Sequence, residues 1–579
     1  MGRPSIIDKY KRYLKNTPVW VRAISGVVAI LMGLWLFTKP FYSLTLMVIM
    51  LAAAIIIDSI SRLSRTGAHR WLGVPMLLGG LLVLLLPGIS VQLISLIVGI
   101  GIIVSGSSDI ITAIKGAQGA RLTAAIKGVS MLMFGALALI WQDMTLLILS
   151  FAFGFKLVIT GISLLINLHK KKTTSRKTKE TAIPTFKKIV GGLEAAFLLL
   201  LALGLMGIGI RLHEAAPIPD AFYSWSGEIP TDPGQLLRYE AYTQAVPEGV
   251  RGWRILYSTT RDEDGTPAVA SAFVMAPQKN SSEPQPIVAW AHGTTGIVPG
   301  CAPTVMKEPF PLDSTVPAVE QAFSNGWVMV GTDYVGLGTE GPHPYLIGQG
   351  EARSVLDSVR AAKQLPGLNL ANKTVIWGHS QGGNAALWAG GLAESYAPDV
   401  NVIGVAAAAP ATELPELLEK NKYSPVGKIM GSFALKSYSE IYPEVSFNEY
   451  VNPFLKPVVE AMAGRCLSET SSLLSLAASL AMPGTIYGKS PMDGVLGQRL
   501  NKNVPTLHIG AELFIAQGEA DPLVLPEIQQ AYTSRIRAAG QELKYKTYPG
   551  LDHLTLVDKA SPYNADLEAW TKSIFASER

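Results

Sequence analysis

Acidic residues are scarce in the first third of this chain. Residues 1–211 contain 6 Asp and Glu against 23 Lys and Arg, a net charge of +17, whereas residues 212–579 have a net charge of −12. The basic residues lie between long apolar runs instead of on one soluble face, which argues against nucleic-acid binding. No small-residue cleavage site follows the first apolar run, and another run comes directly after it, so a cleavable signal peptide is not expected.

Cysteine is nearly absent as well. The 579 residues include two, Cys301 and Cys466, and residues 1–211 have none. This excludes a disulfide within the first part and leaves a single possible pair. If residues 212–579 lie outside the cytoplasm, that pair is free to oxidise. A disulfide is therefore one interpretation, and two unrelated free thiols are the other.

Long apolar runs, by contrast, fill the first part of the chain. Most have the length of about 17–25 residues that an α-helix needs to cross a bilayer. Seven crossings are predicted, at 21–37, 42–60, 71–86, 91–111, 124–141, 144–168 and 189–210. The first six form three hairpins, because a similar pattern of glycines seven residues apart begins at Gly26, Gly73 and Gly128. Small residues at such spacing allow helices to pack closely in lipid.

The basic residues predict the orientation of these helices. Twenty Lys and Arg fall on one side, in the N-terminal segment, in two turns and in residues 169–188, whereas Lys39 alone falls in the opposite turns. The basic side is expected to be cytoplasmic. The domains predicted are a six-helix membrane module at 1–168, a basic cytoplasmic loop at 169–188, a seventh helix at 189–210 and an extracytoplasmic domain at 214–579.

Short apolar runs alternate with helical patterns after residue 230, which predicts a mainly parallel α/β sheet. The strands expected are 287–291, 328–332, 375–377, 402–408, 513–517 and 545–548, with helices near 352–364 and 525–539. Between 410 and 505 the alternation gives way to mixed helix and loop. An insertion there is expected to cover the C-terminal edge of the sheet, where ligands bind.

The strand Val375–Trp377 runs directly into Gly378-His-Ser380-Gln-Gly382, a G-x-S-x-G pattern. This pattern is typical of the nucleophile elbow, in which a tight strand-to-helix turn holds the serine hydroxyl clear of the backbone. The flanking glycines permit the turn because they have no side chain to clash. A serine needs a base to remove its proton and a carboxylate to orient that base.

In this fold the order is serine, then acid, then histidine. Asp521 follows a predicted strand, and His553 follows the last one and is the only outer histidine after Asp521. Glu519, two residues before Asp521, and Asp552, beside His553, are alternatives for the acid. Ser380, Asp521 and His553 are the predicted catalytic residues, with no requirement for a metal or an organic cofactor.

A tetrahedral intermediate also needs two backbone N–H donors that bind its oxyanion. One is predicted at Gln381, directly after the nucleophile. The other is expected in the small-residue turn His292-Gly-Thr294-Thr295-Gly296, at Thr294 in preference to Thr295.

The elbow, the Ala291-His-Gly-Thr-Thr-Gly296 turn, and Gly331-Thr-Asp-Tyr-Val-Gly-Leu-Gly338 followed by His343-Pro-Tyr345 resemble the secretory lipase family of α/β hydrolases over residues 230–575. The resemblance implies ester hydrolysis on acyl lipids, a Ser380–Asp521–His553 triad and a helical cap at 410–505. It also implies structural or pocket-shaping roles for Asp333 and His343. The His-Gly form of the turn departs from the fungal members of this family.

The three hairpins resemble the HdeD-type acid-resistance membrane proteins over residues 20–168. Lys156 falls in mid-span, where a charge is costly, and Asp58 and Asp109 lie at matching hairpin ends. The function predicted is a membrane-anchored, extracytoplasmic serine ester hydrolase, a lipase or esterase whose partners are lipid or ester substrates and the bilayer. Alternatives are an acyltransferase that uses the same acyl-enzyme, and a transport or stress-response protein with an accessory hydrolase domain.

Overall fold

The computed structural model describes residues 18–38, 49–50, 52–53, 55–60, 63, 73–85, 87–115, 121–166, 192, 195–207, and 217–577 apart from 245, 280, 307–315, 468–471 and 483. It divides into two compact units, chiefly residues 1–211 and 212–579. The predicted basic loop 169–188 lies outside the described residues, as do parts of the predicted crossings at 42–60 and 189–210.

The first unit is made of apolar helices. They include α2 (Val19–Thr38), α4 (Gly73–Leu85), α5 (Pro87–Lys115), α6 (Arg121–Ile140) and α7 (Gln142–Ile166). Within the described ranges, three segments have the length and composition to cross a membrane, namely Val19–Leu36, Ser95–Lys115 and Arg121–Ile140. Shorter apolar helices lie at Gly73–Leu85, Phe153–Ile166 and Ala195–Gly207. Seven crossings therefore stay a prediction.

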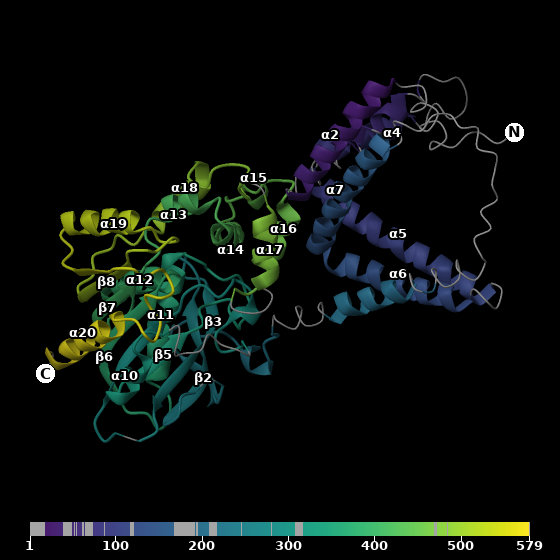
Figure 1. The fold of residues 1–579 in the computed structure, drawn as a ribbon. Helices are drawn as coiled ribbons and strands as arrows, with labels where there is room; N and C mark the ends of the chain where they lie inside the picture. Colours follow the sequence, from purple (N-terminus) through teal and green to yellow (C-terminus); the bar gives the residue numbers. More distant parts are fainter. Residues whose placement is uncertain are drawn as a thin grey trace. The chain divides into compact units, whose positions relative to one another are not determined.

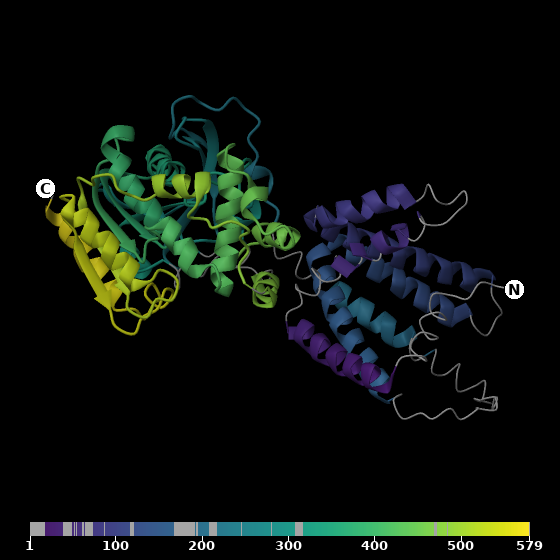
Figure 2. The same ribbon diagram turned by 90° about the horizontal axis from the view of Figure 1, so that it is seen from above.

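Glycines bring these helices into close antiparallel pairs. A Cβ atom added at Gly33 of α2 would lie 2.7 Å from the carbonyl oxygen of Gly154 in α7, and one added at Gly106 of α5 would lie 2.8 Å from that of Gly128 in α6. The pair α2 and α7 runs side by side in Figures 1 and 2. Backbones in such contact leave no room for larger side chains.

The pairing follows the repeat in a cyclic way. The first helix of each repeat has glycines seven residues apart, and each pair faces small residues seven apart on the second helix of the preceding repeat. The facing sets are 26/33 with 161/154, 73/80 with 59/52, and 128/135 with 106/99. The second helix of the last repeat, α7, thus packs on the first helix of the first repeat, α2, and the three repeats close on themselves.

The second unit is built on a nine-stranded sheet (Figure 1). The strands, in chain order, are β1 (Leu236–Ala241), β2 (Val250–Thr260), β3 (Pro267–Pro277), β4 (Gln285–Ala291), β5 (Val328–Thr332), β6 (Leu370–His379), β7 (Val402–Ala408), β8 (Glu512–Gly518) and β9 (Lys544–Tyr548). Their order in the sheet is β1-β2-β3-β5-β4-β6-β7-β8-β9. In this order, the neighbouring strands β5, β4, β6, β7, β8 and β9 pair in parallel, which confirms the predicted α/β hydrolase fold class.

The strands β1, β2 and β3 add an antiparallel edge that the sequence pattern did not predict. Strand β3 is buried along nearly its whole length, so its residues do not alternate between apolar and polar. Strand β2 combines a half-buried first half with a buried second half. Neither has the period-two pattern that marks a strand with one solvent face.

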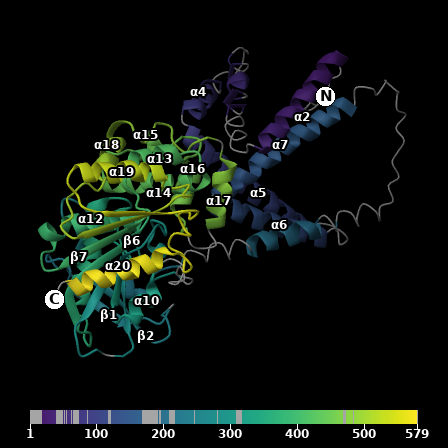
Figure 3. The same cartoon turned by 60° about the vertical axis from the view of Figure 1, so that its left-hand side comes forward.

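Helices cover both faces of the sheet. One core contains residues of α11 (Gly348–Ala362), α12 (Gln381–Tyr396) and α19 (Pro526–Ala538). The other contains residues of α10 (Val319–Ser324) and α20 (Tyr563–Ser577), which lie on the same side of the sheet in Figure 3. Alternate residues of β4 enter opposite cores: Ala289 belongs to the first and Trp290 to the second. A parallel strand buried on both faces is therefore apolar throughout.

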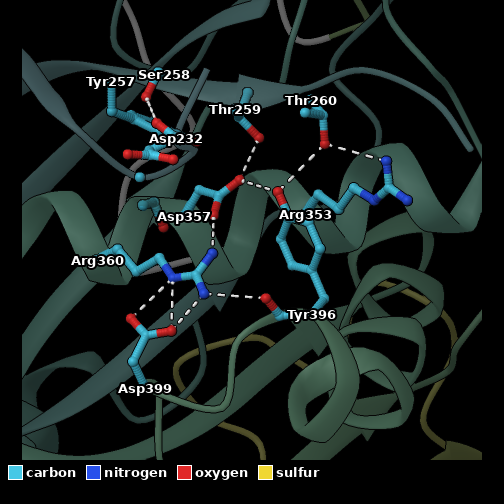
Figure 4. A network of polar contacts seen from close by, with 12 residues as sticks. Asp232, Tyr257, Ser258, Thr259, Thr260, Arg353, Asp357, Arg360, Tyr396 and Asp399 are labelled. Atoms are coloured by element: carbon cyan, nitrogen blue, oxygen red, sulfur yellow. Dashed lines mark hydrogen bonds and ion pairs between the residues drawn. The ribbon is translucent and has the colours of Figure 1, made fainter. Parts of the chain in front are cut away.

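A polar network fastens α11 to its neighbours (Figure 4). The carboxylate of Asp357 accepts hydrogen bonds from Thr259 Oγ1 at the end of β2 and from Tyr396 OH at the end of α12, both at 2.7 Å. Arg360 donates to Asp357 at 3.0 Å and also pairs with Asp399. These contacts fix the position of α11 relative to β2 and α12.

Between β7 and β8, the part of the chain that the structure describes contains six helices. They are α13 (Leu414–Asn421), α14 (Pro425–Ile441), α15 (Phe447–Tyr450), α16 (Lys456–Ala463), α17 (Ser472–Ala481) and α18 (Gly494–Lys502). They occupy the stretch predicted as a cap. Ser424 accepts a hydrogen bond from Gly427 N and Pro425 occupies the first turn, so α14 begins with both an N-cap and a proline.

Candidate active site

Ser380 lies at the junction of β6 and α12 with φ 57° and ψ −117°. A positive φ is strained for a residue that has a Cβ, and such strain is held in place by the surrounding structure. A Cβ at Gly382 would lie 1.9 Å from the carbonyl oxygen of Ala291, and one at Gly378 would lie 2.1 Å from that of Gly382. Both glycines of the pattern are thus required by the close approach of neighbouring backbone.

The three side chains predicted for catalysis form one hydrogen-bonded chain. His553 Nε2 lies 2.9 Å from Ser380 Oγ, and His553 Nδ1 lies 2.8 Å from Asp521 Oδ2. Because a carboxylate only accepts, Nδ1 bears the proton and Nε2 is left to accept from the serine. This is the arrangement in which an imidazole removes a proton from a serine hydroxyl.

Asp521 is held by its own backbone turn. Its Oδ1 accepts hydrogen bonds from the N–H groups of Leu523 and Val524, both at 2.9 Å. Gln517 Nε2 donates to Oδ2 at 3.2 Å. These contacts fix the carboxylate so that one oxygen faces His553.

The alternative acids point elsewhere. Glu519 accepts a hydrogen bond from Thr547 Oγ1 at 2.7 Å, on an exposed part of the surface. Asp552 Oδ1 caps a local turn by accepting from the N–H groups of Leu554 and Thr555. Neither carboxylate is hydrogen-bonded to the imidazole of His553.

His379, which precedes the serine, packs against the other histidine of the site. Its ring centroid lies 4.7 Å from that of His553, and its Nε2–H donates to the His553 carbonyl oxygen at 2.9 Å. Burial and the nearby His553 lower the pKa of His379 to about 3, so the ring is neutral at ordinary pH. Sequence analysis treated His379 as a variable position of the elbow, because its contact partner lies 174 residues away.

The turn that follows β4 lies beside the elbow. A Cβ at Gly293 would be 3.8 Å from Ser380 Cβ. Thr294 lines a cavity of about 30 Å³ together with Ser380 and Gln381. Gln381 is the first residue of α12, so its N–H has no preceding helical carbonyl to bond. Both N–H groups predicted to bind an oxyanion therefore belong to residues around one small space next to the serine.

Further contacts secure this turn. The Thr294 hydroxyl is hydrogen-bonded to Tyr345 OH at 2.9 Å, and the Thr295 carbonyl oxygen accepts from Leu467 N at 2.7 Å. The adjacent Cys466 forms a disulfide with Cys301, with the Cα atoms 5.2 Å apart. The disulfide joins the segment after the turn to the inserted region between β7 and β8.

Asp333 and His292 are buried next to each other at the turn that follows β4. The buried Asp333 carboxylate accepts hydrogen bonds from Ser271 Oγ and from the backbone N–H of Thr304, and burial raises its pKa to about 6. Burial lowers the pKa of His292 to about 4. The hydrogen-bond partners of Asp333 belong to neighbouring loops and strands. Its contacts are therefore structural and fix the segments that surround the site.

A cavity of about 690 Å³ opens at the serine. Its lining combines Ser380 and His553 with apolar side chains, among them Phe273, Trp290, Met430 and Leu476. No Lys or Arg occurs among the described lining residues, and Asp552 is the single acid there. A cavity of this size and character suits a mostly apolar ligand with one polar end.

Taken together, a strained serine on an elbow, a histidine and a carboxylate in sequence order, and an apolar cavity on a parallel sheet define an α/β hydrolase. Comparison with known proteins assigns the two parts of the chain. Residues 312–565 match the family model of the secretory lipases. Residues 24–72, 71–129 and 126–210 match a short repeat of unknown function, DUF308. The C-terminal part thus contains a region similar to the secretory lipases, and the N-terminal part matches the repeat of the HdeD-type membrane family.

Individual relatives agree with this assignment. The chain is 30% identical over 236 residues to the secreted triacylglycerol lipase LIP4 of Malassezia globosa, covering 40% of this chain and 51% of that one. It is 24% identical over 369 residues to lipase A of Moesziomyces aphidis, covering 58% of this chain and 76% of that one. The chain thus spans about half the length of the first of these relatives.

A solved structure shows the same fold. The closed state of Candida antarctica lipase A superposes with a TM-score of 0.52 at 20% identity, covering 63% of this chain and 87% of that one. The DUF308 repeats and the apolar helices indicate a membrane protein.

Proposed function

We propose that this protein is a membrane-anchored serine ester hydrolase, a lipase or esterase that acts on acyl glycerols or related lipid esters. The observation that supports it most directly is the hydrogen-bonded chain Ser380–His553–Asp521 at the mouth of an apolar cavity. The secretory lipase match and the lipase relatives support the same reaction class.

In the proposed reaction, Ser380 Oγ attacks the acyl carbonyl while its proton passes to His553 Nε2. Asp521 holds the imidazole with Nδ1–H directed at its carboxylate and stabilises the imidazolium that forms. The backbone N–H groups of Gln381 and Thr294 bind the oxyanion of the tetrahedral intermediate. His553 then returns the proton to the departing alcohol, and a water molecule releases the acyl group by the same steps.

The lining of the cavity supports an uncharged acyl chain as the ligand. Its walls are apolar side chains, and no cation among the described lining residues is available to bind an anionic group. The volume of about 690 Å³ lies within the range of sites for small ligands, about 300–1,000 Å³.

We further propose that the hydrolase domain lies outside the cytoplasm, with the N-terminus inside. The distribution of Lys and Arg supports this orientation, because basic residues flank membrane helices on the cytoplasmic side. The disulfide between Cys301 and Cys466 supports it independently, because disulfides persist in oxidising compartments.

The test is hydrolysis of p-nitrophenyl esters and of triacylglycerol by the full-length chain in detergent micelles, beside a Ser380→Ala variant. Hydrolysis by the wild-type chain that Ser380→Ala abolishes supports the proposal. Hydrolysis that persists in Ser380→Ala, or no hydrolysis of any ester by a folded wild-type chain, contradicts it.

A further inference from the structure

A second polar cluster, formed by Glu351 and His343, lies next to the residue that follows the nucleophile. The side chain of Gln381 points into it. Gln381 Nε2 donates a hydrogen bond to Glu351 Oε1 of α11 at 2.6 Å and lies 3.1 Å from His343 Nε2. All three residues are buried. The residue whose N–H is proposed to bind the oxyanion is thus also held through its side chain.

The protonation of His343 fixes which way the Gln381 amide points. His343 Nδ1 lies 2.9 Å from the Val335 carbonyl oxygen and must donate to it, so Nε2 is left as an acceptor. Burial lowers the pKa of His343 to about 3, which keeps this ring neutral. The NH₂ group of Gln381 therefore gives one hydrogen to Glu351 and the other to His343.

The same carboxyl oxygen reaches the other side of the predicted oxyanion site. Glu351 Oε1 also accepts from the backbone N–H of Leu346 at 3.0 Å. The preceding residue, Tyr345, is hydrogen-bonded through its hydroxyl to Thr294 Oγ1 at 2.9 Å. Gln381, Tyr345, Leu346 and Thr294 all line the cavity of about 30 Å³ beside Ser380.

Glu351 has no cationic partner that would account for a buried acid. Its side chain is 0% exposed, and no described residue hydrogen-bonds its second oxygen, Oε2. Among the described residues, the one basic side chain within 4.0 Å of its oxygens is His343, whose Nε2 lies 4.0 Å from Oε1 and accepts from Gln381 instead. Burial raises the pKa of Glu351 to about 8, so the group is a neutral acid at pH 7. Its contacts place it as an acceptor that orients two N–H groups.

We propose that Glu351 is a positioning residue of the oxyanion site, which it holds by binding the Gln381 side chain and the Leu346 backbone with one carboxyl oxygen. The proposal rests on the proposed function of Ser380 and adds a residue to it. Through Gln381 it orients the N–H next to the nucleophile, and through Leu346 and Tyr345 it holds the turn that presents Thr294. An oxyanion donor that is displaced binds the transition state less well while leaving substrate binding unchanged.

The helix α11 provides a matched control. Asp357 is a second buried acid on this helix, and its pKa is also raised, chiefly by burial. Its hydrogen-bond partners are Thr259, Tyr396 and Arg360 (Figure 4), which differ from those of Glu351. Asp357→Asn therefore perturbs a buried carboxyl of the same helix without changing the proposed clamp, that is, the hydrogen bonds of Glu351 with Gln381 and Leu346.

The experiment uses the full-length chain in detergent micelles and two readouts. One is kcat and KM for a soluble short-chain p-nitrophenyl ester. The other is the rate at which an alkyl fluorophosphonate labels Ser380, a reaction in which Oγ displaces fluoride and the phosphoryl oxygen occupies the oxyanion site. Gln381→Ala removes the side chain but keeps the backbone N–H, and Glu351→Leu removes the side-chain oxygen that accepts from Gln381 and Leu346. Glu351→Gln keeps a side-chain oxygen that can accept these bonds, and Asp357→Asn is the control.

We expect kcat and the labelling rate to fall roughly 10- to 100-fold in Gln381→Ala and Glu351→Leu with KM unchanged, somewhat less than the loss of a whole oxyanion donor. Glu351→Gln and Asp357→Asn should stay close to wild type. A wild-type rate in Gln381→Ala, or an equal fall in Glu351→Leu and Asp357→Asn, would overturn the proposal. If Glu351→Leu does not fold, Gln381→Ala decides.

The two readouts separate this proposal from the proposed function. A wild-type chain that is labelled at Ser380 but hydrolyses no ester contradicts ester hydrolysis alone, and the labelling rates of the variants still test the clamp. A folded wild-type chain that is not labelled contradicts both.

Discussion

The residues of the proposed site differ in how many contacts hold each of them. Asp521 accepts four hydrogen bonds, from His553, from two backbone N–H groups and from Gln517. Ser380 has a side-chain hydrogen bond to His553 Nε2, and its backbone is held by the close packing at Gly378 and Gly382. Of the four bonds to Asp521, the one from His553 is long-range, and this contact distinguishes Asp521 from Glu519 and Asp552.

Changes at the triad test this view. Ser380→Ala and His553→Ala should each remove nearly all ester turnover, by about 10⁴-fold or more, because the triad acts as a unit. Asp521→Asn should also be severe, since the imidazole loses the charge that orients it. Turnover of a soluble ester by the full-length chain measures the effect, with Glu519→Gln as the control near wild type. A dead Glu519→Gln beside an active Asp521→Asn would move the acid to Glu519.

Glu351 should make stability depend on pH. Burial raises its pKa from the ordinary 4.5 to about 8, so between these values the unfolded chain releases a proton that the folded chain keeps. The contribution is fully present below about pH 4.5 and is lost as pH rises to about 8, on the order of a few kcal/mol. The phenols that face it, Tyr334, Tyr345 and Tyr438, all have raised pKa values and stay neutral in this range.

Thermal unfolding midpoints at pH 5 and pH 9 measure this effect. The wild-type midpoint should fall relative to that of Glu351→Gln, which cannot ionise, as the pH rises. The other buried groups with shifted pKa values are shared by both proteins: Asp333 and Asp357, whose raised pKa values act in the same direction as that of Glu351, and His292, His343 and His379, whose lowered pKa values act in the opposite direction. An identical pH dependence in wild type and Glu351→Gln would show that Glu351 does not titrate in this window.

Among the elements of the inserted region, α17 contributes Leu476 to the wall of the cavity, in addition to Met430 of α14. Residues 470–483 form an uncharged, largely apolar stretch of the sequence, of which the structure describes 472–482. Leu476 lines the cavity with Ser380 and is 40% exposed, whereas Leu473, on the same helix, is 61% exposed and does not line it. An apolar side chain in that position suits contact with an acyl chain.

Leu476→Glu should therefore depress hydrolysis of long-chain esters much more than that of short, soluble ones, because a charge at the cavity wall disfavours an acyl chain. The measurement is the ratio of the two rates in the full-length chain. Leu473→Glu, a charge on the same helix outside the cavity, is the control. Equal loss on both substrates, or unfolding, would mean that Leu476 acts as a packing residue.

The membrane-repeat helices give a second test at this scale. Gly106 of α5 packs against the backbone of α6, with the Gly128 oxygen 2.8 Å from a Cβ added there, whereas a Cβ added at Gly101 of the same helix meets nothing within 4 Å. Gly106→Leu should lower the thermal unfolding midpoint in detergent by separating the two helices, and Gly101→Leu should not. Equal midpoints for both variants would contradict the packing between α5 and α6.

At the scale of the whole molecule, the chain combines a region that matches DUF308 repeats with a region that matches the secretory lipases. Anchoring would keep the proposed hydrolase at the bilayer, where its apolar substrates are concentrated. The two cysteines of the chain, Cys301 and Cys466, form a disulfide with each other, which leaves no thiol to react with an external probe.

This permits a direct test of orientation. A cysteine introduced at Ser226 should react with a membrane-impermeant maleimide in intact cells, whereas one introduced at Thr174 should react only after lysis. The physical reason is the concentration of Lys and Arg on one side of the predicted helices. Labelling at Thr174 alone in intact cells would invert the orientation and would remove the oxidising environment that the disulfide needs.

The sequence by itself determined the features that depend on local chemistry. The elbow at 378–382 is visible because its glycines lie two residues before and two residues after the serine, and the parallel strands β4, β5, β7 and β8 are visible because each is a buried, largely apolar run. The order serine, acid, histidine selected His553 directly. For the acid it left two further candidates, since neighbouring carboxylates at 519, 521 and 552 look alike until their hydrogen-bond partners are known.

Tertiary structure decided what depends on residues far apart in the chain. It placed Asp521 on His553 and turned Glu519 toward Thr547, and it joined Gln381 to Glu351, 30 positions away. It also paired the second helix of each repeat with the first helix of the next, and added three antiparallel strands that lack an alternating pattern. Such contacts arise from long-range packing, whose partners cannot be identified from the residue types on either side alone.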